Sequence, residues 1–259
     1  MINFDLHTHT VWSHGKGTIE ENAAEAARKG LEGIAITDHG FSHPAFGMRR
    51  RYLDEMKREC VAASEKYGVK VLLGIESNLR GEDGTIDVKP KDYEKLDVIL
   101  AGVHRFIYYK YFRDFTRLLG QNIFFNVTKF KPTKNLIAYN TKCYVNAIKH
   151  NPVDVITHVG FLCFCDPVEV AKAAADYGTY IEINTKKTHL SDEQWEKVIE
   201  TGVDFVVDSD AHRVERVGDS ALAEELFKRV NFPMERIKNI NGQVPELRFA
   251  AYKKEHGIG

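Results

Sequence analysis

Short apolar runs alternate with stretches of helical spacing along this chain of 259 residues. The apolar runs are rich in Ile, Val and Leu, which is typical of strands that are covered on both faces. We predict strands at residues 2–8, 33–37, 70–76, 98–103, 153–158, 180–184 and 204–208. Between them the spacing predicts helices at 18–29, 50–67, 137–149, 167–177, 191–201 and 219–230.

The helix starts support this assignment. Thr18 and Glu21 form the pattern of a capping box, and Asp166 followed by Pro167 places an N-cap residue before a proline at the first helical position. Seven strands that alternate with helices indicate βα units and a parallel sheet. With no linker rich in Pro, Gly or Ser, we predict a single domain over residues 1–259. Its fold class is α/β, a closed or nearly closed (β/α)7 barrel of the TIM type.

An open, doubly wound sheet is the alternative architecture. Nucleotide-binding proteins of that class carry a glycine-rich phosphate loop after a strand, and no strand predicted here is followed by one. The sequence therefore favours the barrel.

Residues 105–150 interrupt the alternation. They hold nine Lys or Arg residues against one acid, Asp114, and eleven aromatic residues. We interpret residues of about 105–136 as a basic, aromatic-rich insertion between the fourth and fifth strands, in which the aromatic rings bury a small apolar core. A charged, aromatic segment could instead steer a phosphorylated substrate or bind single-stranded nucleic acid. The buried-core interpretation is favoured, with a modest steering role.

Composition narrows the class of protein further. Lys plus Arg (36) and Asp plus Glu (37) nearly cancel, which disfavours attachment to nucleic acid through bulk positive charge. No secretory signal pattern or membrane-length apolar run is seen, and the four cysteines are too few for a disulfide scaffold. We expect a cytoplasmic protein with reduced thiols that does not bind membranes.

Candidate metal ligands stand where the predicted strands end. His7 and His9 lie two residues apart, so an extended strand points both imidazoles to one side. The other candidates at or just after strand ends are His14, His39, Glu76, His104, His158, Asp210 and His212. In a parallel barrel the strands end at one common face, which brings these residues together. Each of them alone is also compatible with a hydrogen-bonded core residue, but their joint placement favours a metal site.

A mixed set of imidazoles and carboxylates suits Zn, Fe, Mn or Ni better than Mg or Ca. Several closely spaced ions would neutralise a phosphate ester and lower the pKa of a bridging water enough to give hydroxide near neutral pH. Arg49, Arg50, Arg51, Arg213 and Asn184 are candidates for substrate contacts. Solvated loop positions and an ordinary polar strand end explain them equally well.

Six motifs in this order resemble those of the PHP (polymerase and histidinol phosphatase) family. They are His7-Thr8-His9-Thr10, Thr37-Asp38-His39, Gly74-Ile75-Glu76, Gly102-Val103-His104, Thr157-His158-Val159-Gly160 and Ser209-Asp210-Ala211-His212. Together they span nearly the whole chain, and the short chain looks most like the small bacterial phosphatase branch. That resemblance implies a distorted seven-stranded barrel and a trinuclear centre of divalent transition metals (Zn, Mn or Fe).

The resemblance also implies how the ligands are shared. One ion would take His7, His9, Glu76 and Asp210, a second His14, His39 and His212, and a third Glu76, His104 and His158, with Glu76 bridging. The chain departs from the family pattern in Val159, where the branch often has proline, and in its long basic segment.

We expect a metal-dependent phosphoric ester hydrolase, most simply a phosphomonoesterase acting on a small phosphorylated metabolite. Histidinol phosphate is one substrate that the family suggests. A nuclease or phosphodiesterase would use the same metals, with the basic segment holding the strand. A non-catalytic metal-binding regulatory module is less favoured, because all nine candidate ligands are present.

Overall fold

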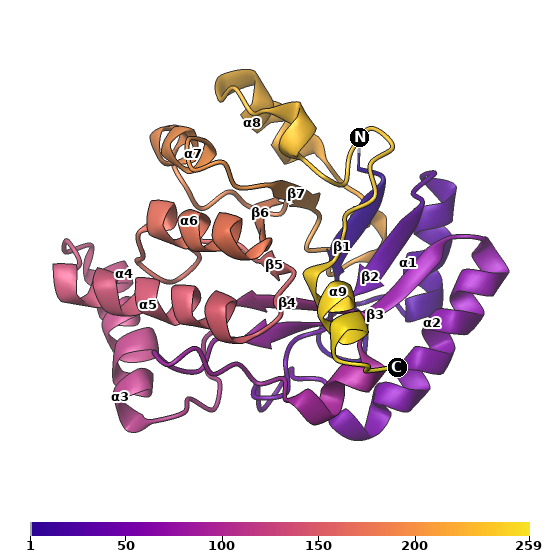
Figure 1. Cartoon of the computed structure of the whole chain (residues 1–259), viewed down its shortest axis with the longest axis horizontal. Coiled ribbons are helices and arrows are strands. Elements are labelled where there is room, and N and C mark those ends of the chain that lie inside the picture. The colour runs from indigo at the N-terminus through magenta and orange to yellow at the C-terminus, as the bar shows by residue number, and fades with distance from the viewer. Residues whose placement is uncertain (1) are drawn as a thin grey trace.

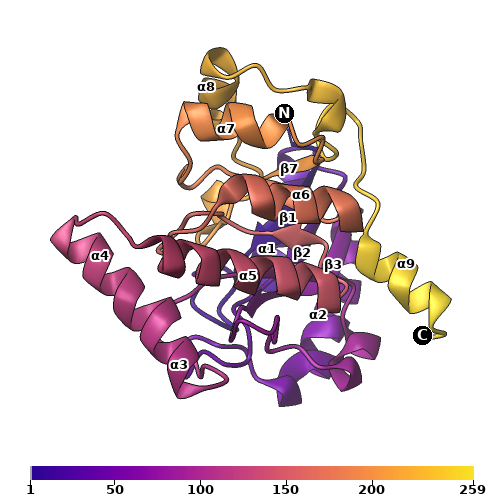
Figure 2. The ribbon, with the colours of Figure 1, turned by 60° about the vertical axis from the view of Figure 1, so that its left-hand side comes forward.

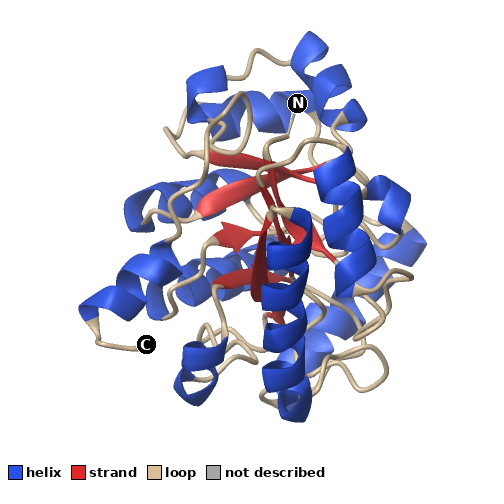
Figure 3. Cartoon of the chain, turned by 90° about the vertical axis from the view of Figure 1, so that its right-hand side faces the viewer, coloured by secondary structure: helices blue, strands red, loops and turns tan. Residues whose placement is uncertain are grey.

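Seven parallel strands form the centre of the molecule in the computed structural model, which describes residues 2–259. The strands follow one another in sequence order: β1 (Phe4–Thr8), β2 (Gly33–Ile36), β3 (Lys70–Asn78), β4 (Val98–Gly102), β5 (Val155–Ile156), β6 (Tyr180–Asn184) and β7 (Phe205–Asp208). Helices cover the outside of this sheet (Figures 1 and 3). The predicted seven-stranded α/β barrel is therefore confirmed.

The α-helices that surround the strands are α1 (Ile19–Arg28), α2 (Leu53–Tyr67), α5 (Lys134–His150), α6 (Pro167–Tyr177), α7 (Asp192–Ile199), α8 (Ala221–Arg229) and α9 (Arg248–Glu255). The Thr18–Glu21 capping box and the Asp166 N-cap are both formed. The predicted helix at 50–67 begins as a 3-10 turn, Arg50–Tyr52, and becomes α-helical at Leu53, where α2 starts. Helix α9 was not predicted.

The barrel closes between β1 and β7 through side chains as well as backbone. Thr8 and Ala211 form an isolated bridge at the mouth. Further down, Asp208 accepts from the backbone N–H of Leu6 at 2.8 Å, and the Asn239 amide donates to the carbonyls of Phe4 and Val207 at 2.8 and 2.7 Å. Buried side chains thus satisfy backbone groups that a full strand ladder would otherwise pair.

The fifth strand is much shorter than the predicted 153–158. His158 has a positive φ of 31°, which is incompatible with extended backbone, and its N–H donates at 2.6 Å to the Glu182 carboxylate rather than to a strand. The third strand runs on to Asn78 instead of ending at Glu76, and the first begins at Phe4 instead of residue 2.

The segment at 105–136 contains helix, which its sequence did not predict. Helix α3 (Phe112–Asp114), a π-helical stretch (Phe115–Gln121) and α4 (Asn122–Thr128) form one continuous rod that contacts α5 and projects past the barrel at an angle to it (Figure 2). The expectation that its aromatic rings are buried is wrong for most of them. The exposed ones are Phe106, Tyr108, Tyr111, Phe112, Phe115, Phe124 and Phe130.

The buried apolar residues of the rod are instead Leu118 and Leu119, and Leu118 shares a core cluster with Tyr139 of α5. The description of residues 1–259 as one domain with an insertion stays a prediction.

Across residues 2–259 no helix combines the length and apolar character that crossing a bilayer requires.

Candidate metal centre

The first strand brings two imidazoles to the mouth of the barrel. His7 lies in β1 and His9 follows it, so their side chains point the same way, and their Nε2 atoms are 3.1 Å apart. Both residues are almost completely buried. They form the floor of the candidate centre.

Glu76 in β3 is the central residue of the cluster. The chain after β2 continues alongside β3, and the resulting bridge between His39 and Glu76 places His39 Nδ1 2.9 Å from Glu76 Oε2. On the other side, His158 Nε2 and His104 Nε2 lie 2.7 and 3.1 Å from Glu76 Oε1. One carboxylate therefore faces imidazoles from both of its oxygens.

A glycine allows this packing. A Cβ atom on Gly102, at the end of β4, would lie 2.2 Å from Thr157 Oγ1 and 2.8 Å from the His158 ring. Any larger residue would push His158 away from Glu76.

The segment after β7 completes the ring of candidates. Asp210 Oδ1 lies 3.4 Å from His9 Nε2 and 3.1 Å from His212 Nδ1. Asp210, like His158, has a positive φ, 47° here. Left-handed backbone in a non-glycine residue costs conformational energy, and it concentrates at functional sites. Two of the nine candidates are held in this conformation.

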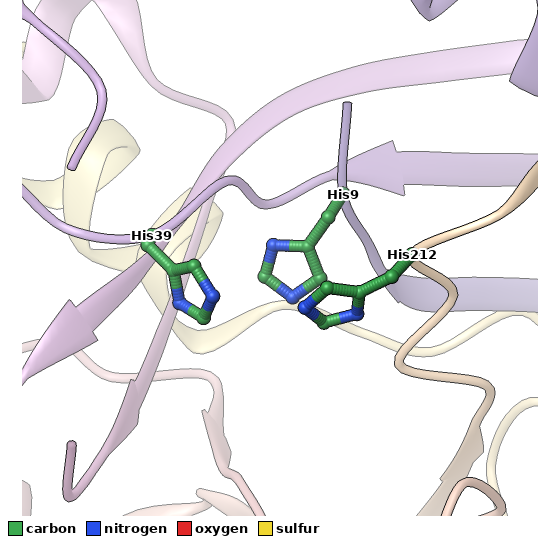
Figure 4. Close-up of side chains that lie close together, drawn as sticks. All are labelled: His9, His39 and His212. Atoms are coloured by element: carbon green, nitrogen blue, oxygen red, sulfur yellow. The ribbon is translucent and has the colours of Figure 1, made fainter. Parts of the chain in front are cut away.

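His14 joins the cluster from the loop between β1 and α1. Its ring centroid lies 4.6 Å from that of His212 and 5.4 Å from that of His39. The rings of His9, His39 and His212 face one another although they come from three separate segments (Figure 4). The structure thus brings all nine predicted residues to one mouth. Their roles as ligands stay a prediction.

The donor atoms are close enough to share cations. Three groups each offer ligand atoms within 4.8 Å of one another, namely His9 with His39 and His212, His7 with His9 and Glu76, and His39 with Glu76 and His104. His9, His39 and Glu76 each belong to two of these groups, whereas His14, His158 and Asp210 belong to none of them. Among residues 2–259, His39 Nδ1 and Glu76 Oε2 are both buried atoms without a well-directed hydrogen bond. A cation between them would satisfy both.

The protonation states of two candidates, His39 and His9, also fit cation binding. Burial lowers the pKa of His39 to about 4 against the pull of Glu76, and burial together with neighbouring His39 holds the pKa of His9 well below its usual value. Both imidazoles are then neutral at pH 7, as a metal ligand must be. Burial would raise the pKa of Glu76, but His104 and His7 outweigh it and hold that pKa well below normal.

Glu182 is a supporting residue that the sequence analysis missed. Its Oε1 atom lies 2.6 Å from His7 Nδ1, and its Oε2 atom accepts from the His158 N–H. A carboxylate on the far nitrogen fixes the tautomer and orientation of a metal-ligating imidazole. The available signal was an acid inside the apolar strand β6, two residues before Asn184 and hence on the same face.

Asp38 is a second supporting residue. Its carboxylate accepts from the backbone N–H of Thr10 at 2.7 Å, from the Thr10 hydroxyl and from the Ser13 hydroxyl. These bonds tie down the loop that carries His9 and His14. Burial raises the pKa of Asp38 to about 6, although the three donors oppose this shift.

Three of the five predicted substrate residues, Asn184, Arg49 and Arg213, occupy different positions. Asn184 lines the cleft, but its amide donates to Glu182 and Asp210 and its oxygen accepts from the N–H groups of Lys186 and Lys187. Arg49 donates to the carbonyl of Pro44 at 2.8 Å. Neither Arg49 nor Arg213 lines the cleft, and both are exposed. Substrate contact by these residues stays a prediction.

Lys186, which the sequence analysis did not single out, does reach the centre. Its Nζ atom lies 3.3 Å from Asp210 Oδ1 and 3.1 Å from His212 Nδ1, while half of the side chain is exposed. The cleft above the cluster has a volume of about 410 Å³. That is the size of a site for a small molecule.

Known proteins share both the sequence pattern and the fold. The family model described as PHP domain matches residues 5–186. A protein of Caldanaerobacter subterraneus subsp. tengcongensis named "Probable phosphatase" is 34% identical over 98% of this chain and 93% of its own length. A "Probable phosphatase" of Shewanella sp. (strain MR-4) is 31% identical over 91% of this chain and 86% of its own. These alignments cover nearly the full chain, whereas the family model ends before Asp210 and His212.

A solved structure has a similar fold at low sequence identity. The histidinol phosphate phosphatase of Lactococcus lactis, in complex with Zn, L-histidinol and phosphate, superposes with a TM-score of 0.58. It is 16% identical, and the match covers 89% of this chain and 94% of that one. At this identity the likeness describes the fold alone.

Proposed function

This chain belongs to the PHP family, and from that premise we propose that it is a metal-dependent phosphomonoesterase that acts on a small phosphorylated metabolite. The observation that carries the proposal is the ring of imidazoles around Glu76 at the mouth of the barrel. The full-length relatives named as phosphatases support the reaction class.

Three divalent transition-metal ions would be held by the nine candidates. The proposed sets are those that the family resemblance implies: His7, His9, Glu76 and Asp210; His14, His39 and His212; and Glu76, His104 and His158. Such ions would neutralise the phosphate charge and activate the attacking water. Zn is favoured by its presence in the Lactococcus lactis enzyme, and Mn and Fe are compatible with the same donors.

The chain itself supplies orientation and charge. Glu182 holds the His7 imidazole and the backbone N–H of His158, and Asp38 holds the loop that carries His9 and His14. Lys186, Lys187 and Arg105 line the cleft and would attract a phosphate dianion. With Asp210 engaged by a cation, the Lys186 ammonium would be free to donate to a phosphate oxygen, which a charge-assisted hydrogen bond would favour.

Monoester hydrolysis is favoured over diester hydrolysis by the size of the site. The cleft has a volume of about 410 Å³, which suits a small molecule. The basic segment at 105–136, with its exposed aromatic rings, is the observation that favours a nuclease or phosphodiesterase. A cytoplasmic location is retained as a prediction.

The test compares p-nitrophenyl phosphate with bis(p-nitrophenyl) phosphate, using protein loaded with Zn or Mn. We expect hydrolysis of the monoester to exceed that of the diester by at least tenfold, a difference of about 1.4 kcal/mol in transition-state stabilisation. Faster hydrolysis of the diester would overturn the monoesterase proposal. Stoichiometric metal binding without turnover of either ester would instead indicate a binding module.

A further inference from the structure

Aromatic side chains form the cleft walls above the candidate ligands. Phe46, Phe106 and Phe161 line the hollow, together with the imidazoles of His43 and His189. Phe46 is 44% exposed and Phe106 is 64% exposed, although each is large and apolar. Exposed apolar surface gathered in a cleft is a mark of ligand binding.

The rings form two clusters next to the candidate centre. The Phe46 ring is tilted against those of His14 and His43, with ring centroids 4.7 and 5.0 Å apart. Phe161 lies against His158 and His189, at 5.0 and 4.9 Å.

The two clusters stand on different sides of the barrel. Phe46 follows β2 and Phe161 follows β5, and β3 and β4 separate these two strands in the sheet. A group bound to the phosphate would therefore leave the centre between two aromatic walls.

The charges of the walls are of one sign. Arg105, Lys186 and Lys187 line the cleft, whereas among residues 2–259 the only carboxylates that line it are Glu76 and Asp210, which face the candidate metal ligands. A substrate ammonium would thus find no free carboxylate. The phenyl faces could attract it by a cation–π contact, but Phe is a weaker partner than Trp, and three nearby cations would repel the ammonium.

We propose that the alcohol part of the substrate carries a planar ring that is neutral or anionic, held between Phe46 and Phe161. This inference rests on the proposed phosphomonoesterase function and narrows its substrate class. It disfavours amino-alcohol phosphates, histidinol phosphate included, because their ammonium group has no acidic partner on the cleft walls.

The first experiment compares benzyl phosphate with cyclohexylmethyl phosphate. The two esters have similar leaving alcohols and differ mainly in the planarity of the ring. We expect kcat/KM to be about three- to tenfold higher for benzyl phosphate, the effect of one or two aromatic contacts beyond simple burial.

Two variants and a control assign the preference to the walls. Phe46→Leu and Phe161→Leu should each lower the ratio of the two kcat/KM values toward one. Phe124→Leu removes an exposed ring of α4 that lies outside the cleft, and it should leave the ratio unchanged. Because each ratio is taken within one variant, partial loss of metal or of folded protein cancels.

The second experiment tests the charge of the walls. We expect 4-carboxybenzyl phosphate to be preferred over 4-(aminomethyl)benzyl phosphate, and Lys187→Gln to reduce that preference. Equal rates for benzyl and cyclohexylmethyl phosphate, or a preference for the ammonium ester, would overturn the inference.

Failure of the proposed function is recognisable separately. If no phosphomonoester is hydrolysed with any metal, binding of benzylphosphonate and cyclohexylmethylphosphonate is compared by calorimetry on metal-loaded protein. Tighter binding of benzylphosphonate that Phe46→Leu abolishes supports the aromatic walls without catalysis. Equal affinity, or no binding of either phosphonate, contradicts them.

Discussion

Two buried carboxylates at opposite ends of the barrel have opposite surroundings. Glu76, at the mouth, faces the imidazoles of His39, His104 and His158, and its pKa is held well below normal. Asp154 lies at the opposite end, immediately before β5, and accepts from the backbone N–H groups of Ile99 and Phe249, both at 2.8 Å. Burial raises its pKa to about 7, although these two N–H groups oppose the shift.

The difference separates an acid that the backbone satisfies from an acid that faces candidate metal ligands. The partners of Asp154 are backbone amides, so its carboxyl is satisfied by the fold and anchors α9 through Phe249. The partners of Glu76 are side chains, and among residues 2–259 the Nδ1 atoms of His39, His104 and His158 are buried without a well-directed hydrogen bond. Burial is common to both carboxyls, and only Glu76 has neighbours with donor atoms that a cation would satisfy.

The largest effect is expected from Glu76→Ala. Removing the carboxylate shared by two proposed ion sites should lower kcat/KM on p-nitrophenyl phosphate by about 10²–10³-fold or more, the scale for losing one electrostatic element of an active site. Metal analysis should show fewer than three ions per chain. Full metal content in this variant would rule out the bridging role.

The control for Glu76→Ala is Asp154→Asn, at the other end of the barrel, which should leave metal content and kcat/KM unaltered. Loss of metal in this variant would erase the distinction between the two carboxylates.

A smaller effect is expected from Glu182→Gln. Because this carboxylate orients His7 from behind, its loss should weaken metal affinity by about 10–100-fold, as for other outer-shell partners. Competition with a chelator measures the affinity. Glu196→Gln, an exposed acid on α7, is the control. Identical affinities in the two variants would assign Glu182 a purely structural role.

The next largest effect is expected from Lys186→Gln, which removes the positive charge beside Asp210 and His212. If Lys186 donates to the substrate phosphate, KM should rise roughly tenfold, since a hydrogen bond to a charged group contributes about 1.5–3 kcal/mol. Arg213→Gln and Arg49→Gln remove cations outside the cleft and should change KM by less than about twofold. A larger effect at Arg213 than at Lys186 would restore the sequence-based assignment of the substrate contacts.

The smallest effect on activity, and a distinct effect on stability, is expected from the titration of Asp154. Its folded-state pKa, about 7, lies above the ordinary 3.8, so between these values the folded state binds more protons than the unfolded state. The contribution of this carboxyl to the free energy of unfolding is therefore fully present below about pH 4 and is lost as the pH rises to about 7.

Urea unfolding of metal-free protein across this pH range measures the contribution. Relative to Asp154→Asn, the wild type should lose up to a few kcal/mol between about pH 4 and 7. Parallel stability curves for the two proteins would show that the pKa of Asp154 is not raised.

The sequence carried enough information for the strands and for the nine candidates. Apolar runs mark buried parallel strands, and polar residues at their ends stand out against them. Glu182 escaped because it lies inside a strand, where only its charge within an apolar run gives a signal. Phe46 and Phe161 could not be predicted to line the cleft, because they lie in loops. Loop residues have no regular repeat that indicates where a side chain points.

Other features depend on tertiary structure. The shortness of β5 follows from the left-handed backbone of His158, which Glu182 stabilises from a different strand. The rod at 112–128 includes a π-helical stretch around Gly120, so its apolar residues do not repeat with the regular helical period. Packing against α5 holds it in place.

The most direct test of the account is metal reconstitution followed by activity. Metal-free protein is titrated with Zn²⁺ or Mn²⁺ while bound metal and hydrolysis of p-nitrophenyl phosphate are recorded together. The account predicts about three ions per chain, with activity appearing as the sites fill. In His9→Ala it predicts a lower metal content and a loss of hydrolysis. Full activity of the metal-free protein, or unchanged metal content and activity in His9→Ala, would contradict it.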